Sequence, residues 1–235
     1  MTSHPTPSAS ASPAASFWLL VLAAASVLMV TMGVRMTLGL YVAPINQATG
    51  LGIAGISFAL AVAQIMWGVS QPVLGGLSDR YGAWPVLFWG TLVLAAGCVL
   101  VPLLPSTWGL TATLGVLVAF GAGAGSFSVM MGLVANRVPP HLRGTSSGII
   151  NAGGSFGQFL MVPVEGWLIA SLGWKEALLA LSAMVLLIVP LAFGLREPGF
   201  KGTAPVKRDQ TIAQALGEAF RYPSFNLLMA GYFVC

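Results

Sequence analysis

Two charged side chains, Arg35 and Glu165, lie inside long apolar runs of the sequence. In a hydrocarbon environment each charge would cost at least about 2.5–3.5 kcal/mol without a partner. A mutual ion pair is one interpretation. In another interpretation, Arg35 binds an anionic ligand, because a guanidinium can make two parallel hydrogen bonds to a carboxylate. Glu165 would then be free to exchange a coupling proton. The residues alone leave these alternatives open.

Neutral polar residues follow helical spacing in the same runs. Thr31 precedes Arg35 by four residues, and a longer stripe at i, i+4, i+7 and i+14 ends at Glu165. Such spacing puts side chains on one face of a helix. Polar faces in a membrane either line a cavity or hydrogen-bond neighbouring helices. The candidate ligand-binding residues are Thr31, Arg35, Gln64, Asn151, Ser155 and Gln158.

The sequence contains no set of residues typical of an enzyme active site. Its two histidines, His4 and His141, lie outside the apolar runs, and no nucleophile–base pair accompanies them. The glycine-rich segment 121–125 resembles part of a dinucleotide-binding loop, but it follows no predicted strand. Cys98 and Cys235 lie in apolar runs, as small buried hydrophobic residues do. Neither a cofactor nor a metal ion is expected.

The apolar runs determine the predicted fold class. They cover about 17–44, 51–77, 84–104, 108–135, 146–171 and 175–195. Each is long enough for the roughly 20 apolar residues that cross a hydrocarbon core of about 30 Å. Backbone in lipid must satisfy its own hydrogen bonds, and continuous runs favour helices over the short alternating strands of a barrel. The sequence predicts an all-α membrane protein with a six-helix transmembrane bundle over 17–195.

The distribution of basic residues indicates the orientation of this bundle. Eight of the ten Lys and Arg follow an even-numbered span, whereas Lys175 is the one that lies in an odd-numbered loop. By the positive-inside rule, the even loops and both chain ends are cytoplasmic, in a multi-pass protein of the cytoplasmic (inner) membrane. The same bias explains the net charge of +4, so no nucleic-acid-binding surface is expected.

The segments outside the bundle differ in character. Residues 1–16, rich in Ser, Pro and Ala, are predicted to form a disordered cytoplasmic tail. Residues 196–223 are predicted to form a cytoplasmic central loop, with an amphipathic helix near 211–220 that lies on the membrane surface. Residues 224–235 begin another apolar run, which as a helix covers only about half of a bilayer core. We expect a truncated seventh span there, in a fragment of a longer protein.

Polar residues group the spans in threes. Spans three and six carry few of them and are expected to face lipid. A pattern of three plus three is expected for the inverted repeats in half of a transporter.

The loop after the second span reads Gly75-Gly-Leu-Ser-Asp-Arg-Tyr-Gly82. This sequence resembles the signature of the major facilitator superfamily between its second and third helices. The family usually continues with two basic residues, where this chain has Ala83 and Trp84. Arg137 and Arg143, in the segment 136–144, resemble the weaker echo of the signature in the second repeat. The resemblance implies a cytoplasmic gate rather than a solvated turn, formed by Gly75, Leu77, Asp79, Arg80, Gly82, Arg137 and Arg143.

Three further segments resemble the bacterial branch of this superfamily that is similar to monocarboxylate and oxalate/formate transporters. They are Gly33-Val-Arg-Met-Thr-Leu-Gly-Leu-Tyr-Val-Ala-Pro-Ile45, Asn151-Ala-Gly-Gly-Ser-Phe-Gly-Gln158 and Arg221-Tyr-Pro-Ser-Phe225. The resemblance implies the N-terminal half of a twelve-helix carrier that works by alternating access. Its partners would be a small, anionic substrate, a coupling proton or counter-substrate, the bilayer and a C-terminal six-helix half. A drug or metabolite efflux antiporter and a seven-helix membrane sensor are the alternatives.

Overall fold

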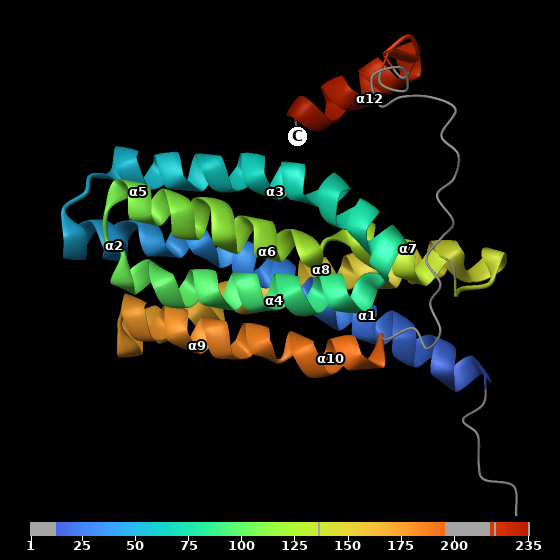
Figure 1. Ribbon diagram of the computed structural model, residues 1–235, viewed down its shortest axis with the longest axis horizontal. Helices are drawn as coiled ribbons and strands as arrows, with labels where there is room; N and C mark the ends of the chain where they lie inside the picture. The colour runs from blue at the N-terminus through green and yellow to red at the C-terminus, as the bar shows by residue number, and fades with distance from the viewer. Residues whose placement is uncertain (1–12, 136, 196–216, 219, 235) are drawn as a thin grey trace, which may run out of the picture. The chain divides into compact units, whose positions relative to one another are not determined.

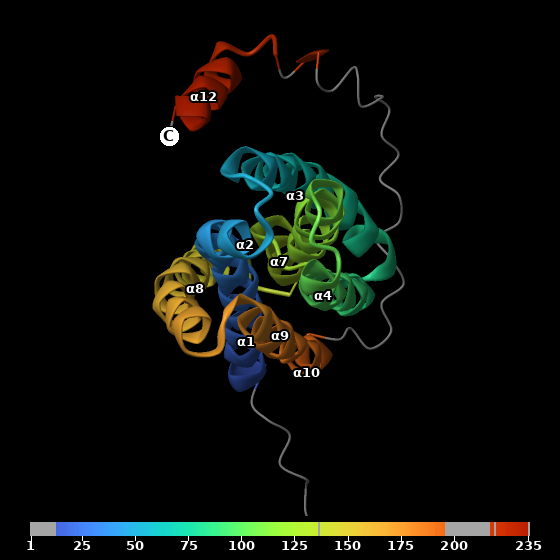
Figure 2. The same ribbon diagram turned by 90° about the vertical axis from the view of Figure 1, so that its left-hand side faces the viewer.

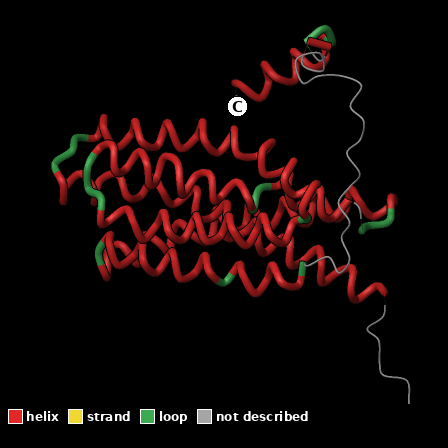
Figure 3. The backbone as a smooth tube through the Cα atoms, in the orientation of Figure 1, coloured by secondary structure: helices red, strands yellow, loops and turns green. Residues whose placement is uncertain are grey.

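The computed structural model describes residues 13–135, 137–195, 217–218 and 220–234. All regular structure in these residues is helical (Figure 3). The chain divides into two compact units, Met1–Gly202 and Thr203–Cys235. Most of the predicted tail and central loop, at 1–12 and 196–216, lies outside the described residues.

Six helical segments in the first unit are long and apolar enough to cross a membrane. These spans are Phe17–Thr49, Ile53–Tyr81, Ala83–Leu103, Thr107–Val134, Pro140–Leu172 and Trp174–Phe193. The all-α fold with six spans is therefore confirmed. The elements are α1 (Pro13–Thr37), η1 (Leu38–Tyr41), α2 (Val42–Thr49), α3 (Ile53–Tyr81), α4 (Ala83–Leu100), η2 (Val101–Leu103), α5 (Thr107–Leu110), η3 (Thr111–Val118), α6 (Ala119–Ala124), α7 (Phe127–Ala135), η4 (Pro140–Leu142), α8 (Arg143–Leu172), α9 (Trp174–Leu186) and α10 (Ile188–Gly194).

The first span is longer than the sequence analysis predicts. Pro44 does not end it, because this proline lies in the first turn of α2, where its missing N–H is not needed. The span ends instead at Gly50, whose φ of 67° is a left-handed conformation that suits glycine. Arg35 therefore lies roughly 20 Å from this end of the span, well inside the helix.

The fourth span is not a uniform α-helix. It passes from α5 into a π-helical segment, η3, and then into α6. Regular helix stops after Ala124 and resumes at Phe127 in α7. Short π-segments inside helices occur frequently at functional sites, so these interruptions direct attention to the side of α1 and α3 that the fourth span contacts.

Backbone geometry reveals the internal repeat. α3 ends at Gly82, with φ 90° and ψ 158°, and α8 ends at Gly173, with φ 94° and ψ 163°. Each helix also contains a proline ten residues before its glycine, at Pro72 and Pro163. The packing is exchanged between the repeats: the first span packs on the fifth, and the fourth packs on the second. These equivalences join spans one to three and four to six as two three-helix repeats.

Close packing in the bundle depends on small residues. A methyl group at Gly157 of α8 would clash with the carbonyl of Met29 on α1, and one at Gly153 would lie 2.7 Å from the carbonyl oxygen of Ala25. These glycines let the two backbones approach, so α1 runs along α8 over much of its length. Figure 1 shows the long helices of the first unit side by side, and Figure 2 shows the same bundle from its end.

Burial differs between the spans in an unexpected way. The second and fifth spans are the least buried, with 22% and 17% of an apolar 18-residue window in each span inside the bundle. The third and sixth spans reach 50% and 39%, although they were predicted to face lipid. Burial inside this six-helix unit does not test that prediction, because a span can pack on its neighbours with one side and face lipid with the other, so it stays a prediction.

The second unit contains one long helix among its described residues, α12 (Pro223–Val234). The side-chain amide of Asn226 donates to the carbonyl of Phe220 at 2.8 Å, and the Phe220 and Phe225 rings meet edge to face. This helix covers the segment predicted to begin a seventh span. Of the predicted amphipathic helix, only 217–218 and 220 are described.

Candidate functional site

Arg35 forms the centre of the candidate site. Its Nη2 donates a hydrogen bond to Oε1 of Gln64 on α3, and its guanidinium lies 4.0 Å from the centroid of the Trp67 ring. Gln64 and Trp67 are three residues apart, so one face of α3 presents both to Arg35. The structure thus brings together two of the predicted candidates, Arg35 and Gln64.

A cavity of about 210 Å³ adjoins this cluster. The first, second and fourth spans line it, through Arg35, Met36, Leu38, Gly39, Leu60, Ala63, Gln64, Trp67, Val118, Ala119 and Ala122. The wall formed by the fourth span begins where π-helical η3 passes into α6. Apart from Arg35, Gln64 and Trp67, the residues that line the cavity are apolar.

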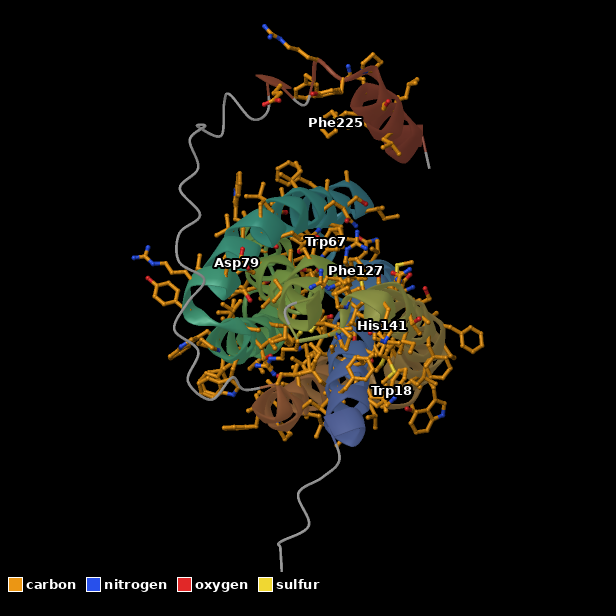
Figure 4. All side chains as sticks on the ribbon, turned by 90° about the vertical axis from the view of Figure 1, so that its right-hand side faces the viewer. Trp18, Trp67, Asp79, Phe127, His141 and Phe225 are labelled. Atoms are coloured by element: carbon orange, nitrogen blue, oxygen red, sulfur yellow. The ribbon has the colours of Figure 1, made fainter. Side chains whose placement is uncertain are left out.

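Trp67 contributes a further polar atom. Its indole Nε1 is buried and has no hydrogen-bond partner among the described residues. An indole N–H can only donate, and a buried donor without a partner is costly. Figure 4 shows Trp67 on the α3 ribbon. Arg35 is the charged group beside the cavity, and its guanidinium supplies donors but no acceptor, which suits a ligand with negatively charged oxygens.

Thr31 forms a hydrogen bond between helices, the second of the two roles that the sequence left open for polar faces. Its hydroxyl donates to the carbonyl of Gly125 at 2.9 Å, at the interruption of the fourth span, and also lies 3.0 Å from the Val27 carbonyl of its own helix. Thr31 does not line the cavity. It ties α1 to the carbonyl group that the interrupted helix exposes.

Glu165 and Arg35 have separate partners. The Glu165 carboxyl is fully buried and accepts a hydrogen bond from the Tyr41 hydroxyl. Arg35 bonds to Gln64 instead. The predicted alternative of an Arg35–Glu165 ion pair is therefore not formed in this structure. Among the described residues no carboxylate forms a salt bridge with Arg35, so its charge inside the span lacks a counter-ion.

The polar stripe on α8 divides between two environments. Asn151 and Ser155 are exposed and Gln158 is partly buried, and none of them lines the Arg35 cavity. Glu165 is buried with Gly157 and other residues that pack against α1. Fourteen residues fall about 40° short of four full turns, so Glu165 is rotated from the stripe towards the α1 contact.

The predicted gate residues lie at the far end of α3. Asp79 and Arg80 are exposed in the last turn of that helix, and the Asp79 Oδ1 lies 3.8 Å from where a methyl group would stand at Gly132 of α7 (Figure 4). The Arg80 guanidinium is 5.2 Å from the Tyr81 ring. Gly82 is buried and has a positive φ. Gly75 is partly buried, and Leu77 is exposed. Asp79 therefore faces the end of the fourth span.

The echo of this signature contacts the end of the sixth span. Nη2 of Arg137 lies within 3.5 Å of the carbonyl oxygen of Leu195, the residue after α10. A cation there complements the partial negative charge of the helix C-terminus. Partial burial lowers the pKa of the Arg137 guanidinium from its usual value. Arg143, by contrast, is exposed at the first residue of α8.

Sequence reasoning missed two residues that the structure places at these sites. Trp67 and Tyr41 were passed over because aromatic residues in apolar runs are usually packing residues. The spacing of Gln64 and Trp67 was the available signal, since three residues put them on one helix face. No group of three or more His, Cys, Asp or Glu in the described part of the chain could hold a metal ion.

Comparison with known proteins identifies the family. The model of the Major Facilitator Superfamily matches residues 18–235, which is nearly the whole chain. The chain belongs to this superfamily. Together with the transporters named next, this membership favours a transporter over an enzyme.

Several curated relatives are transporters of organic acids by name. The chain is 28% identical over 220 residues to the oxalate:formate antiporter of Oxalobacter formigenes, and the match covers 92% of the chain and 51% of that protein. It is 28% identical over 225 residues to monocarboxylate transporter 11 of Mus musculus, covering 92% and 50%. A hexuronate transporter of Bacillus subtilis is 29% identical over 151 residues, covering 63% and 33%. The chain spans about half the length of the first two relatives.

Proposed function

We propose that this chain forms the N-terminal half of a secondary transporter that carries a small organic anion, such as a monocarboxylate, by alternating access. The observation that supports the proposal most strongly is the position of Arg35. Its charge lies inside a membrane span, beside a cavity, with an amide rather than a carboxylate as its partner. A charge at such a depth is costly unless a counter-charge arrives, and a substrate carboxylate supplies one.

Each residue around the cavity has a distinct task in this proposal. Arg35 makes the charged contact, through those N–H groups that Gln64 does not use. Gln64 and the Trp67 ring hold the guanidinium in place from two sides. The Trp67 ring also forms part of the cavity wall.

The names of the relatives favour an organic anion over the efflux antiporter alternative, because oxalate, formate, monocarboxylates and hexuronates are all organic anions.

The remaining parts of the proposal concern the whole carrier. The exposed faces of the second and fifth spans suit a second six-helix half, and the substrate would bind between the two halves. The basic residues put the N-terminus and the Asp79 loop on the cytoplasmic side of the inner membrane. The substrate would move with a coupling proton or in exchange for a counter-substrate.

Counterflow in proteoliposomes tests the substrate class. The full-length carrier is loaded with unlabelled lactate and supplied with labelled lactate, formate or oxalate, and lactamide serves as the matched competitor without a charge. We expect at least one labelled anion to accumulate, and lactate but not lactamide to compete. Equal competition by lactamide, or exchange of lipophilic cations in place of anions, would contradict the proposal.

A further inference from the structure

A second polar site lies apart from the Arg35 cavity, where the first and fifth spans meet. The Glu165 carboxyl of α8 has no exposed surface, and Tyr41 of η1 is 1% exposed. The Tyr41 hydroxyl donates to Oε1 of Glu165, and Oε2 has no hydrogen-bond partner among the described residues. The Cys98 thiol of α4 is buried in the same hydrophobic core as Tyr41. The site is thus a closed compartment around one carboxyl group.

The neighbouring elements supply no cation to this compartment. Arg35 on α1 is engaged with Gln64 and Trp67 on the second span. At the start of α9, the Lys175 ammonium lies 5.6 Å from the Trp174 ring, and both Lys175 and Glu176 are exposed. Arg143 lies at the opposite end of α8. Tyr41 and Cys98 are therefore the titratable groups that face Glu165 from the described elements packed around it.

Packing does not require a carboxyl at this position. The two repeats can be aligned on Gly82 and Gly173, and Glu165 then corresponds to Leu74, eight residues before the glycine in each case. Leu74 is buried and packs near Gly123 of the fourth span, as α8 packs on the first span. An apolar side chain fills the equivalent place in the other repeat. The acid group of Glu165 thus adds a chemical function to a position that packing alone could fill.

The protonated form suits this compartment far better than the ionised form. A buried carboxylate without a cation loses its hydration and recovers only the Tyr41 hydrogen bond. A neutral carboxylic acid leaves one hydroxyl without an acceptor, which costs far less than an isolated charge. Oε2, the oxygen without a partner, is the atom that can carry the proton.

We propose that Glu165 and Tyr41 form an occluded proton-binding site in the N-terminal bundle. A proton from water binds the Glu165 carboxylate and gives a neutral carboxylic acid, and no other bond changes. Protonation stabilises the arrangement in which η1 packs against α8. Deprotonation leaves a buried charge and favours an arrangement in which Glu165 reaches water.

The link to transport rests on the proposed function. Tyr41 lies six residues after Arg35 on the same span, so a movement of this span that opens the Arg35 cavity also displaces the hydrogen-bond donor of Glu165. Proton release and substrate movement would then depend on one structural change. The protonation state itself can be tested without any transport measurement.

Infrared spectroscopy of the purified full-length carrier at neutral pH tests the protonated state. We expect a carboxylic-acid C=O band that is lost in Glu165→Gln and retained in the matched control Glu176→Gln. Tyr41→Phe removes the hydrogen bond, so the same band should shift to higher frequency. This variant keeps the test decisive if Glu165→Gln fails to fold. Identical bands in wild type and Glu165→Gln, or an unmoved band in Tyr41→Phe, would overturn the proposal.

Substrate-driven proton uptake in proteoliposomes, followed with a pH-sensitive dye, tests the coupling. Glu165→Gln should lose proton uptake while substrate exchange at constant pH continues, and Glu176→Gln should retain both. Full proton uptake by folded Glu165→Gln would overturn the coupling role. Absence of substrate exchange in the wild type contradicts the proposed function instead, and the infrared result then still decides the proton site.

Discussion

The guanidinium of Arg35 on the first span donates to the side-chain amide of Gln64 on the second, beside a cavity that both residues line. An amide fixes the position of the guanidinium without neutralising it. A carboxylate at position 64 would do both, and this difference can be used to test the role of Arg35.

Replacing Gln64 with glutamate should block the anion site from within. The new carboxylate would pair with Arg35 and compete with the substrate for its charged donors. Losing a hydrogen bond to a charged group costs about 1.5–3 kcal/mol, so the apparent substrate affinity should fall about tenfold or more. Uptake kinetics provide the measurement, and Gln71→Glu is the control because it adds the same charge seven residues further along α3, outside the cavity lining. Equal effects of the two substitutions would argue against a specific site at Arg35.

Asp79 provides a test of the predicted gate. Its carboxylate lies at the end of α3 and faces the Gly132 region of α7. Asp79→Asn should shift the carrier towards inward-facing states and reduce uptake, while its abundance in the membrane is unchanged. Glu176→Gln serves as the control, because Glu176 is an exposed carboxylate outside the signature. Unchanged uptake in Asp79→Asn would show that Asp79 belongs to a solvated turn and has no part in a gate.

Cysteine labelling in intact cells tests the orientation. His141 and Pro105 are both exposed, and they lie at span ends that the basic residues assign to opposite sides of the membrane. We expect a cysteine at 141 to react only with permeant thiol reagents and one at 105 to react with impermeant reagents as well. The parent protein controls for Cys98, which is buried. Impermeant labelling at position 141 would reverse the orientation and the gate assignment.

The contact of α1 with α8 should be sensitive to a single methyl group. A methyl group at Gly157 would clash with the backbone of Met29, and overpacking of this kind typically costs about 1–3 kcal/mol. Gly157→Ala should therefore lower the thermal stability of the purified carrier. Gly148→Ala on the same helix has open space around it and should be neutral or mildly stabilising. Equal melting temperatures for the two variants would show that close backbone approach at Gly157 is unimportant.

The sequence predicted the fold more completely than the site. Long apolar runs specify six helices because the bilayer demands length and internal hydrogen bonding. The end of the first span was misplaced, since a proline such as Pro44 can either terminate a helix or begin a new one. The partner of Thr31 could not be predicted, because the interruption at Gly125 depends on how the fourth span packs.

The sequence could not predict which side chains form hydrogen bonds between spans. Arg35 and Glu165 are the two charges inside apolar runs, so an ion pair between them was a reasonable alternative. The choice of Gln64 and Tyr41 as their partners depends on the rotation of each helix about its axis. Periodicity defines the faces of a helix, but it does not say which neighbour each face meets.

The most direct test of the central claim compares Arg35→Gln and Arg35→Lys in the full-length carrier, with Arg221→Gln as a control at an exposed arginine outside the bundle. Labelled monocarboxylate uptake and membrane abundance are measured for each protein, and also for Arg35→Gln combined with Glu165→Gln. The account predicts normal abundance throughout, no uptake in either protein that carries Arg35→Gln, and weakened apparent affinity in Arg35→Lys, which keeps the charge but loses the planar fork. Normal uptake by Arg35→Gln, or recovery of lost abundance and uptake in the double variant, would contradict the assignment of Arg35 as the residue that binds the anion.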